Sequence, residues 1–309
     1  MSAEGMESGR ARRPHGMDIG LALGGGGARG LAHIGVLQVL EEEGFRIRAV
    51  AGTSMGGIMA AAYASGLAPR EIEALAARTA LRDLLQMRPG GDALLGLDRV
   101  AEFLHDFLGD RTFAEMRLPL ALTATDLTTC EEVVFSEGRV VDAVLATIAL
   151  PGIFPPRIQG EHRLVDGAVL DPVPVRPVRR LYDGLLLAVA LSPSRDKWPE
   201  ARSPNPLEML PGFSVLTRLR PAQALQVFVQ AMEISSRMHT ELRLAIDRPD
   251  VLIRPEVWHV PLLDDPSLAD MVEAGRSVTT AALPDLMRQF VWGRRLGRML
   301  RRLVRRDRA

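Results

Sequence analysis

The sequence predicts an α/β fold with a mainly parallel central sheet flanked by helices. Two observations favour this fold class. Short apolar runs alternate with segments of helical periodicity along the chain, and strands that alternate with helices form parallel sheets through right-handed crossovers. The chain has 309 residues, of which 47% are hydrophobic and 25% charged, a composition typical of a globular protein with a sizeable buried core. Because the elements interleave throughout, we expect one α/β domain.

Two strand–helix units open the domain. An apolar run at residues 19–23 enters a glycine cluster, which indicates a buried strand that ends in a turn. Residues 31–43 then have apolar side chains at helical spacing and stop at Gly44. A second apolar run at residues 46–51 indicates the next strand, and small side chains over residues 55–65 indicate a tightly packed helix.

Later segments continue the alternation. Further strands are expected at residues 120–125, 132–136, 162–165, 185–191 and 251–254. Helices are expected at residues 69–87, 97–108, 140–149, 225–246 and 268–290, the last of them bent near Pro284. A proline-rich segment at residues 197–211 predicts a surface loop.

Charge and hydropathy divide the chain into three parts. Residues 1–17 are polar and have no apolar run behind their arginines, so we expect a flexible leader and no secretory signal. Residues 18–287 are expected to form the α/β domain, with its motifs at residues 19–180, and residues 288–309 a basic amphipathic tail. No apolar run reaches the length of about 18 residues that a membrane-spanning helix needs. Cys130 is the single cysteine, which excludes an internal disulfide and favours a cytoplasmic location.

The tail has the pattern of a helix that lies on a membrane surface. The chain is neutral overall, with 38 Lys+Arg and 38 Asp+Glu, which argues against a general nucleic-acid binder. In a helical tail Leu296, Met299 and Leu303 share one face and the arginines occupy the other, which predicts contact with anionic lipid on the inner face of the membrane. A solvated charge run and a nucleic-acid contact are the alternatives. The arginines concerned are Arg294, Arg295, Arg298, Arg301, Arg302, Arg305 and Arg306.

The glycine cluster after the first strand has two functional interpretations. Residues 25–30 satisfy the dinucleotide fingerprint G-x-G-x-x-G between a strand and a helix. A dinucleotide site also needs an acidic residue at the end of the second strand, and residues 50–54 there contain no carboxylate. The phosphate-loop interpretation also fails, because no Gly-Lys-Ser/Thr follows the cluster. Both kinds of site share a nest of amides at a helix N-terminus, which attracts negative charge, and this charge can be a transient oxyanion. A tight turn without a ligand is the structural alternative.

A serine turn is the sharper functional signal. Gly52-Thr53-Ser54-Met55-Gly56 matches G-x-S-x-G at the junction of a predicted strand and a predicted helix. In such an elbow the serine projects from a strained turn at a helix N-terminus, and flanking glycines let neighbouring elements pass closely. An ordinary N-cap role is the alternative for Ser54, but the glycine nest one strand earlier favours a nucleophile.

A nucleophilic serine needs a base, and the sequence offers two kinds. Asp166-Gly167-Ala168 turns directly out of a short predicted strand, and a buried aspartate with a raised pKa accepts a serine proton. A plain Asp-Gly turn is the alternative. An α/β-hydrolase triad would instead recruit a histidine, in particular His239 or His259, although no sequence context distinguishes any of the histidines after Ser54. These are His105, His162, His239 and His259.

Taken together, the three motifs resemble those of the patatin-like phospholipases. The resemblance is closest to bacterial members akin to the catalytic domain of neuropathy target esterase. It is strong over residues 19–180 and continues more weakly to residue 282. The motifs lie at residues 24–30, 52–56 and 166–168, and flanking segments that also resemble the family lie at residues 124–127, 149–156 and 172–175.

The resemblance implies a three-layer patatin-like fold and a serine acyl hydrolase with a Ser–Asp dyad. Ser54 would be the nucleophile and Asp166 the base. The implied reaction is hydrolysis of a phospholipid or lysophospholipid ester through an acyl-enzyme, without metal or organic cofactor. Arg29 would steady the glycine loop or hold a phosphate head group. The implied oxyanion hole consists of the amides of Gly25, Gly26, Gly27, Ala28, Arg29 and Gly30, and the implied supporting residues are Gly52, Gly56, Gly167 and Ala168.

Two positions depart from the family pattern. Thr147 stands where relatives often have serine, and Asp171 where they often have asparagine. Both lie outside the implied dyad, so they affect packing or substrate fit and leave the implied chemistry in place. A remaining interpretation from another class is a nucleotide-binding or membrane-tethered module without catalysis, against which the missing ribose-binding acid counts.

Overall fold

A computed structural model describes residues 16–79, 84, 86–87, 95–201 and 220–290. Within this part of the chain, eight strands form one sheet in the order β10-β9-β1-β2-β5-β8-β7, with β6 paired to β5. Strands β10, β9, β1, β2 and β5 pair in parallel, whereas β6, β8 and β7 pair antiparallel at one side. The strands are β1 (Asp18–Leu23), β2 (Arg46–Gly52), β5 (Leu120–Asp126), β6 (Glu131–Phe135), β7 (Arg157–Gln159), β8 (His162–Asp166), β9 (Leu185–Val189) and β10 (Val251–Ile253).

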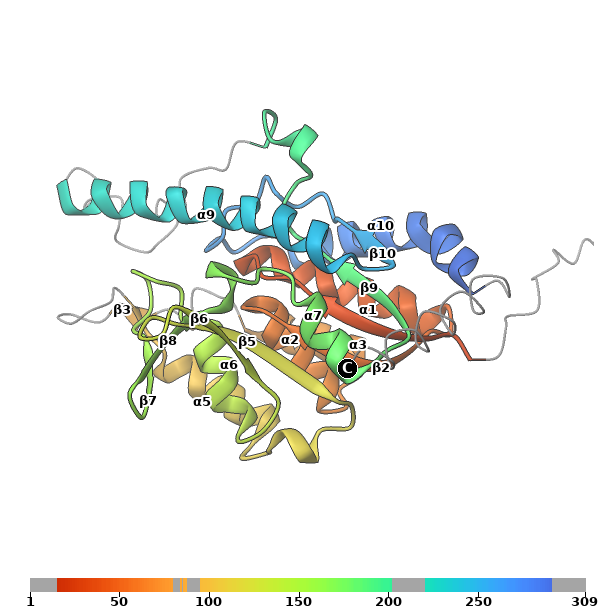
Figure 1. Ribbon diagram of the computed structural model, residues 1–309, viewed down its shortest axis with the longest axis horizontal. Helices are drawn as coiled ribbons and strands as arrows, with labels where there is room; N and C mark the ends of the chain where they lie inside the picture. Colours follow the sequence, from red (N-terminus) through yellow and green to blue (C-terminus); the bar gives the residue numbers. More distant parts are fainter. Residues whose placement is uncertain (1–15, 80–83, 85, 88–94, 202–219, 291–309) are drawn as a thin grey trace, which may run out of the picture.

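Helices lie on both sides of this sheet, which runs through the middle of the molecule (Figure 1). The α/β class with a mainly parallel central sheet is therefore confirmed. The α-helices among the described residues are α1 (Ala32–Glu42), α2 (Met55–Ala64), α3 (Pro69–Arg78), α5 (Asp98–Leu108), α6 (Val140–Thr147), α7 (Val175–Leu181), α9 (Arg220–Asp247) and α10 (Leu268–Gln289). Short 3-10 turns include η1 (Gly27–Leu31) and η3 (Gly167–Val169).

The three layers follow from the alternation of side chains along the strands. Leu21 and Leu187 point into the larger core, which they share with side chains of α1, α2, α5, α6 and α10. Their neighbours Ala22 and Ala188 point to the opposite face, into a smaller core covered by α7 and by Leu244 of α9. β1 and β9 therefore contribute to two apolar layers, which is why these central strands are apolar almost throughout.

The sheet brings the predicted motifs to one place. β1 and β2 are parallel, and Leu23 pairs with Gly52, so the glycine loop after β1 and the serine turn after β2 emerge side by side. Gly52 in turn pairs with Leu122 of β5, and two residues further along β5 Ala124 pairs with Asp166 of β8. The antiparallel edge thus returns the third motif to the end of the sheet from which the first two emerge.

One predicted helix is wrong in part. The expected helix over residues 69–87 ends as α3 at Arg78, where Thr79 has an extended backbone with φ −131° and ψ 100°. Gln86–Met87 instead form strand β3, which pairs antiparallel with Leu95–Gly96 of strand β4. Thr79 is β-branched, and its extended conformation ends the regular turns of α3.

Several predictions fall outside the described residues. These are the leader at residues 1–15, most of the surface loop at residues 202–211 and the tail at residues 291–309 with its arginines. The boundaries proposed for leader, domain and tail stay predictions. None of the helices within the described residues is both long and apolar enough to cross a membrane.

Candidate active site

The serine turn has the geometry of a nucleophile elbow. Ser54 lies between β2 and α2 with φ 54° and ψ −127°, a backbone conformation that is strained for a residue with a side chain. A Cβ atom at Gly52 would overlap the carbonyl of Gly56, and one at Gly56 would overlap the carbonyl of Leu23. Both glycines of G-x-S-x-G are therefore required by close backbone contacts, as the sequence pattern predicts.

The side chain of Ser54 meets that of Asp166. Ser54 Oγ donates a hydrogen bond to Asp166 Oδ2 at 2.6 Å, across 112 residues of sequence. The Ser54 amide donates to Thr147 Oγ1 at 2.9 Å, so a hydroxyl at this position holds the elbow whether serine or threonine supplies it. The departure at Thr147 therefore preserves the contact, and its methyl group packs beside Gly57.

Asp166 is fixed at the end of β8 by its second oxygen. Oδ1 accepts a hydrogen bond from the amide of Ala168 at 2.8 Å, which caps η3. At Gly167 a Cβ atom would overlap the hydroxyl of Thr123, so the turn needs glycine. Burial raises the pKa of Asp166 to about 6, against the opposing hydrogen bonds from Ser54 and Ala168. At neutral pH the carboxylate is thus ionised and is a better proton acceptor than an ordinary aspartate.

The glycine loop lies against Ser54. A Cβ atom at Gly25 would lie 3.1 Å from the Ser54 Cβ. Three loop amides already donate to backbone carbonyls: Gly25 to Pro172 at 2.9 Å, Ala28 to Leu262 at 2.8 Å and Arg29 to Gly26 at 3.2 Å.

Two amides of the loop are available to a ligand. Gly30 lies inside η1, where amides bond to the preceding turn. By contrast, no acceptor within the described residues bonds the amides of Gly26 and Gly27, which stand at the N-terminal end of η1. Helix N-termini leave such donors open, so Gly26 and Gly27 are the members of the expected set that best suit an oxyanion.

Arg29 faces protein groups. Its side chain is 3% exposed, and Nε donates to the carbonyl of Val260 at 2.6 Å. Nη2 donates to Glu233 on α9 at 2.9 Å. Of the two roles implied by the family resemblance, these contacts favour steadying the glycine loop.

A mainly apolar cavity of about 440 Å³ opens onto Ser54, Asp166 and the glycine loop. It continues between α2, α3 and α5, away from the two polar side chains. Its apolar lining there includes Ile58, Met59, Leu75, Val100, Phe103 and Phe107. A long hydrocarbon chain fits such a lining, whereas a charged nucleotide does not.

The expected histidine alternative finds no geometric support. Within the described residues, the hydrogen bonds to the Asp166 carboxylate come from Ser54 and Ala168. His162 Nδ1 instead bonds Asp126 at 2.6 Å, and His105 lies 3.7 Å from Asp110. Neither His239 nor His259 makes a described hydrogen bond to Ser54 or Asp166.

Sequence reasoning missed two groups that support the site. His33 is fully buried in α1, and its Nε2 donates to the carbonyl of Gly24 at 2.8 Å, which holds the start of the glycine loop. Burial lowers the pKa of His33 to about 4, so it stays a neutral donor. Thr53, beside the nucleophile, donates to the carbonyl of Asp171 at 2.9 Å. A polar residue among the apolar side chains of the first turns of α1 was the available signal for His33.

Fold and site together define a class: α/β proteins with an elbow serine that is paired to a carboxylate beneath a glycine loop. Residues 21–179 match the family model described as patatin-like phospholipase. The chain belongs to the patatin-like phospholipase family.

Curated relatives agree with this family. An uncharacterized NTE family protein of Mycobacterium bovis is 34% identical over 215 residues, which cover 67% of this chain and 59% of that protein. Lysophospholipase NTE1 of Pyricularia oryzae is 28% identical over 242 residues, covering 72% of this chain and 16% of that protein. The chain thus spans less than two thirds of the length of these relatives. Among solved structures, VipD from Legionella pneumophila matches with a TM-score of 0.45 and 15% identity, over 88% of this chain and 67% of VipD.

Proposed function

We propose that the chain is a lipid acyl hydrolase that cleaves a phospholipid or lysophospholipid ester through Ser54 and Asp166. The observation that carries the proposal is the hydrogen bond of 2.6 Å from Ser54 Oγ to Asp166 Oδ2, at the end of an apolar cavity. Membership of the patatin-like phospholipase family supports the substrate class, as does the name of the relative that is called a lysophospholipase.

Acylation begins at the serine hydroxyl. Ser54 Oγ attacks the ester carbonyl carbon, and its proton passes to Asp166 Oδ2 as the new C–O bond forms. The carbonyl π electrons move to oxygen, and the oxyanion accepts hydrogen bonds from the amides of Gly26 and Gly27. The N-terminus of α2, which begins at Met55 directly after the nucleophile, adds favourable potential there.

The tetrahedral intermediate then collapses. The bond to the alcohol oxygen breaks, and the departing alkoxide takes the proton from Asp166, which leaves an acyl-enzyme on Ser54. Water enters and attacks the acyl carbon while Asp166 accepts its proton. The bond between the acyl carbon and Ser54 Oγ then breaks, Oγ takes the proton from Asp166, and the fatty acid leaves. The cavity between α2, α3 and α5 holds the acyl chain throughout.

The test compares active-site variants on a soluble ester and on lysophospholipid. A fluorophosphonate probe should label Ser54, and Ser54→Ala and Asp166→Asn should each lower kcat by about 10³-fold or more. His239→Ala and His259→Ala are the matched controls and should stay within about twofold of the wild type.

Two results would contradict the dyad. Loss of activity in one histidine variant with intact folding would favour the Ser–Asp–His alternative. Absence of labelling together with tight dinucleotide binding would favour a non-catalytic module. Circular dichroism of every variant separates loss of chemistry from loss of fold.

Attachment to a membrane through the arginine-rich tail remains part of the proposal. The pattern of residues 294–306 supports it, and so does a lipid substrate. Residues 291–309 lie outside the described part of the chain. A peripheral location on the cytoplasmic face of a membrane is proposed on the same grounds.

A further inference from the structure

Helix α9 has its apolar side turned outward. It lies along the outside of the molecule in Figure 1, where it is drawn in cyan. Ile234, Met238, Leu242 and Ile246 recur at every fourth position and are 66%, 39%, 52% and 65% exposed, and Val227 is 64% exposed. Side chains four residues apart lie above one another on a helix. We call these five residues the outer face of α9.

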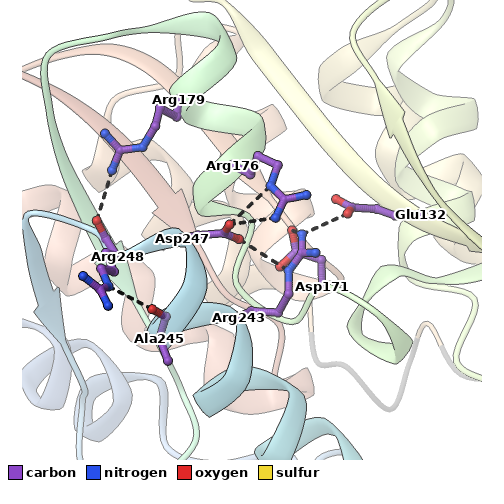
Figure 2. A network of polar contacts seen from close by, with 8 residues as sticks. All are labelled: Glu132, Asp171, Arg176, Arg179, Arg243, Ala245, Asp247 and Arg248. Atoms are coloured by element: carbon purple, nitrogen blue, oxygen red, sulfur yellow. Dashed lines mark hydrogen bonds and ion pairs between the residues drawn. The ribbon is translucent and has the colours of Figure 1, made fainter. Parts of the chain in front are cut away.

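The charged side chains that the structure describes on the same helix point inward. Glu233 pairs with Arg29, Arg237 donates to the carbonyl of Ala201, and Glu241 pairs with Arg254. Figure 2 shows Arg243 and Asp247 reaching into the body of the protein. Their partners there are Glu132, Asp171 and Arg176.

The usual amphipathic arrangement is therefore inverted. A surface helix normally buries its apolar stripe and exposes its charges, whereas no exposed residue of α9 between residues 223 and 246 is charged. The inward ion pairs hold this orientation, since turning the helix over would take Arg243 away from the fully buried carboxylate of Asp171. An apolar surface of this kind marks an interaction site.

The helix that carries the outer face also lines the cavity. On its other sides α9 contributes Val229, Met232, Ser236 and Thr240 to the cavity lining. Near its N-terminal end Phe228 lies 3.4 Å from the position of a Cβ atom on Gly152, in the segment between α6 and β7. One helix therefore separates the candidate active site from the exposed apolar stripe.

The size and charge of this face fit a lipid surface better than a second copy of the chain. The stripe from Val227 to Ile246 is roughly 30 Å long at about 1.5 Å per residue and about 10 Å wide, hence roughly 300 Å². A stable dimer buries about 800 Å² on each partner. A helix that lies in the plane of a bilayer needs only an apolar face that sinks about 5–10 Å below the head groups.

We propose that the outer face of α9 docks on the surface of a lipid bilayer and thereby brings the cavity to its substrate. The inference rests on the proposed lipid acyl hydrolase function, because that function supplies the reason for docking. Vesicle binding is nevertheless measured without turnover, so failure of one proposal is distinguishable from failure of the other.

The first experiment measures co-sedimentation of the full chain with neutral phosphatidylcholine vesicles. Salt at about 0.5 M screens attraction between arginines and lipid. Ile234→Glu and Leu242→Glu should each lower the partition coefficient about tenfold or more. Ile158→Glu is the matched control, because Ile158 is 67% exposed on β7, and it should stay within about twofold of the wild type. Ser54→Ala should bind like the wild type.

The second experiment locates the contact directly. Cys130 is the single cysteine, so a Cys130→Ser background accepts one label. An environment-sensitive fluorophore on Ile234→Cys should shift to shorter wavelength when phosphatidylcholine vesicles are added, whereas the same fluorophore on Ile158→Cys should not. Both substitutions are at exposed positions, so the fold should tolerate them.

Three results would overturn the proposal. One is absence of wild-type binding to neutral vesicles. A second is binding that requires anionic lipid at low salt and is unchanged by Ile234→Glu, which would assign it to the arginine-rich tail. The third is a stable dimer in light scattering that Ile234→Glu converts to a monomer, which would assign the outer face to a second copy of the chain.

Discussion

Burial and chemistry are most directly coupled at Asp166. Its side chain is 2% exposed, and its two oxygens are bonded by Ser54 and by the amide of Ala168. Burial disfavours the charged form and the two donors favour it, and the balance raises the pKa from 3.8 to about 6. The carboxylate is therefore ionised at neutral pH and still basic enough to share the proton of Ser54.

The pH dependence of hydrolysis should report this ionisation. In the proposed mechanism only the ionised carboxylate accepts the Ser54 proton, so kcat/KM on a soluble ester should fall as pH decreases, with a midpoint near 6. Below the midpoint the decrease should be about tenfold per pH unit. A pH–rate profile measures it. A midpoint near 4 would show that burial does not set the basicity of this group.

The ionisation of Asp166 should also appear in the free energy of unfolding, which is measured without substrate. A carboxyl whose folded pKa is raised loses stability as pH rises from its unfolded value of 3.8 to about 6. Asp166→Asn has no such loss, so its free energy of unfolding should exceed that of the wild type by roughly 2–3 kcal/mol at neutral pH. The difference should shrink towards pH 4, as measured by urea unfolding.

At the scale of single residues, the sequence pointed to candidate site residues that lie in recognisable motifs. It missed supporting residues that belong to no motif. Ser54 and Asp166 stand in turns whose glycines are required by sterics, so the pattern was local and readable. His33 and Thr53 act through backbone carbonyls of Gly24 and Asp171. Hydrogen bonds of that kind leave no spacing in the sequence, because their partners are set by tertiary packing.

At the scale of elements, the glycine loop depends on how α1 is held. α1 begins directly after η1 and crosses α10 at a very close approach. A Cβ atom at Gly35 would overlap the backbone of Val272, and one at Gly275 would overlap the carbonyl of Ala32. Two helices that meet through glycines fix the start of α1, and with it the glycine loop that lies against Ser54.

Gly275→Ala should therefore destabilise the protein by about 2–3 kcal/mol, because the added methyl group forces two backbones apart. The measurement is the free energy of unfolding in urea. Gly160→Ala is the matched control: Gly160 lies in the turn between β7 and β8 with open space around it, so only the backbone penalty of about 1 kcal/mol applies. Equal effects would refute the close-contact explanation.

Element prediction succeeded where periodicity and breakers agreed. The strands at β1, β2 and β9 are apolar runs between turns, and each was expected within a residue or two of its bounds. It failed at Thr79, whose backbone is extended, and at Gln86–Met87, which form a strand where the apolar spacing predicted a helix. β7, a strand of three residues, is too short to show any period.

At the scale of the whole molecule, ion pairs attach α9 to the sheet. Arg243 bonds Glu132 of β6 and Asp171 beyond η3, each at 2.9 Å, across 111 and 72 residues of sequence (Figure 2). Asp171 is fully buried, and burial raises its pKa. The aspartate that departs from the family pattern thus belongs to a network that holds α9 in place. No sequence pattern predicts pairs so far apart.

Removing the guanidinium of Arg243 should show how much the stability of the protein depends on the ion pairs between α9 and the sheet. Arg243→Leu leaves two carboxylates without their common partner and should lower the free energy of unfolding by about 3 kcal/mol or more. Adding Asp171→Asn should restore part of it, because a neutral amide needs no counterion. Arg179→Ala is the control, since its bond to the Arg248 carbonyl is exposed, and it should cost under about 1 kcal/mol. Additive effects of Arg243→Leu and Asp171→Asn would exclude the coupling.

The positive φ of Ser54 lowers stability at the same position that supplies the proposed nucleophile. Glycine is the one residue that would relax a φ of 54°, and glycine carries no hydroxyl. A lineage that no longer needed the proposed reaction would gain stability by replacing Ser54 with glycine. A lineage that needs the reaction must keep the strained serine. A relative that keeps this fold but has glycine at the position of Ser54 is therefore expected to have lost the proposed hydrolase activity.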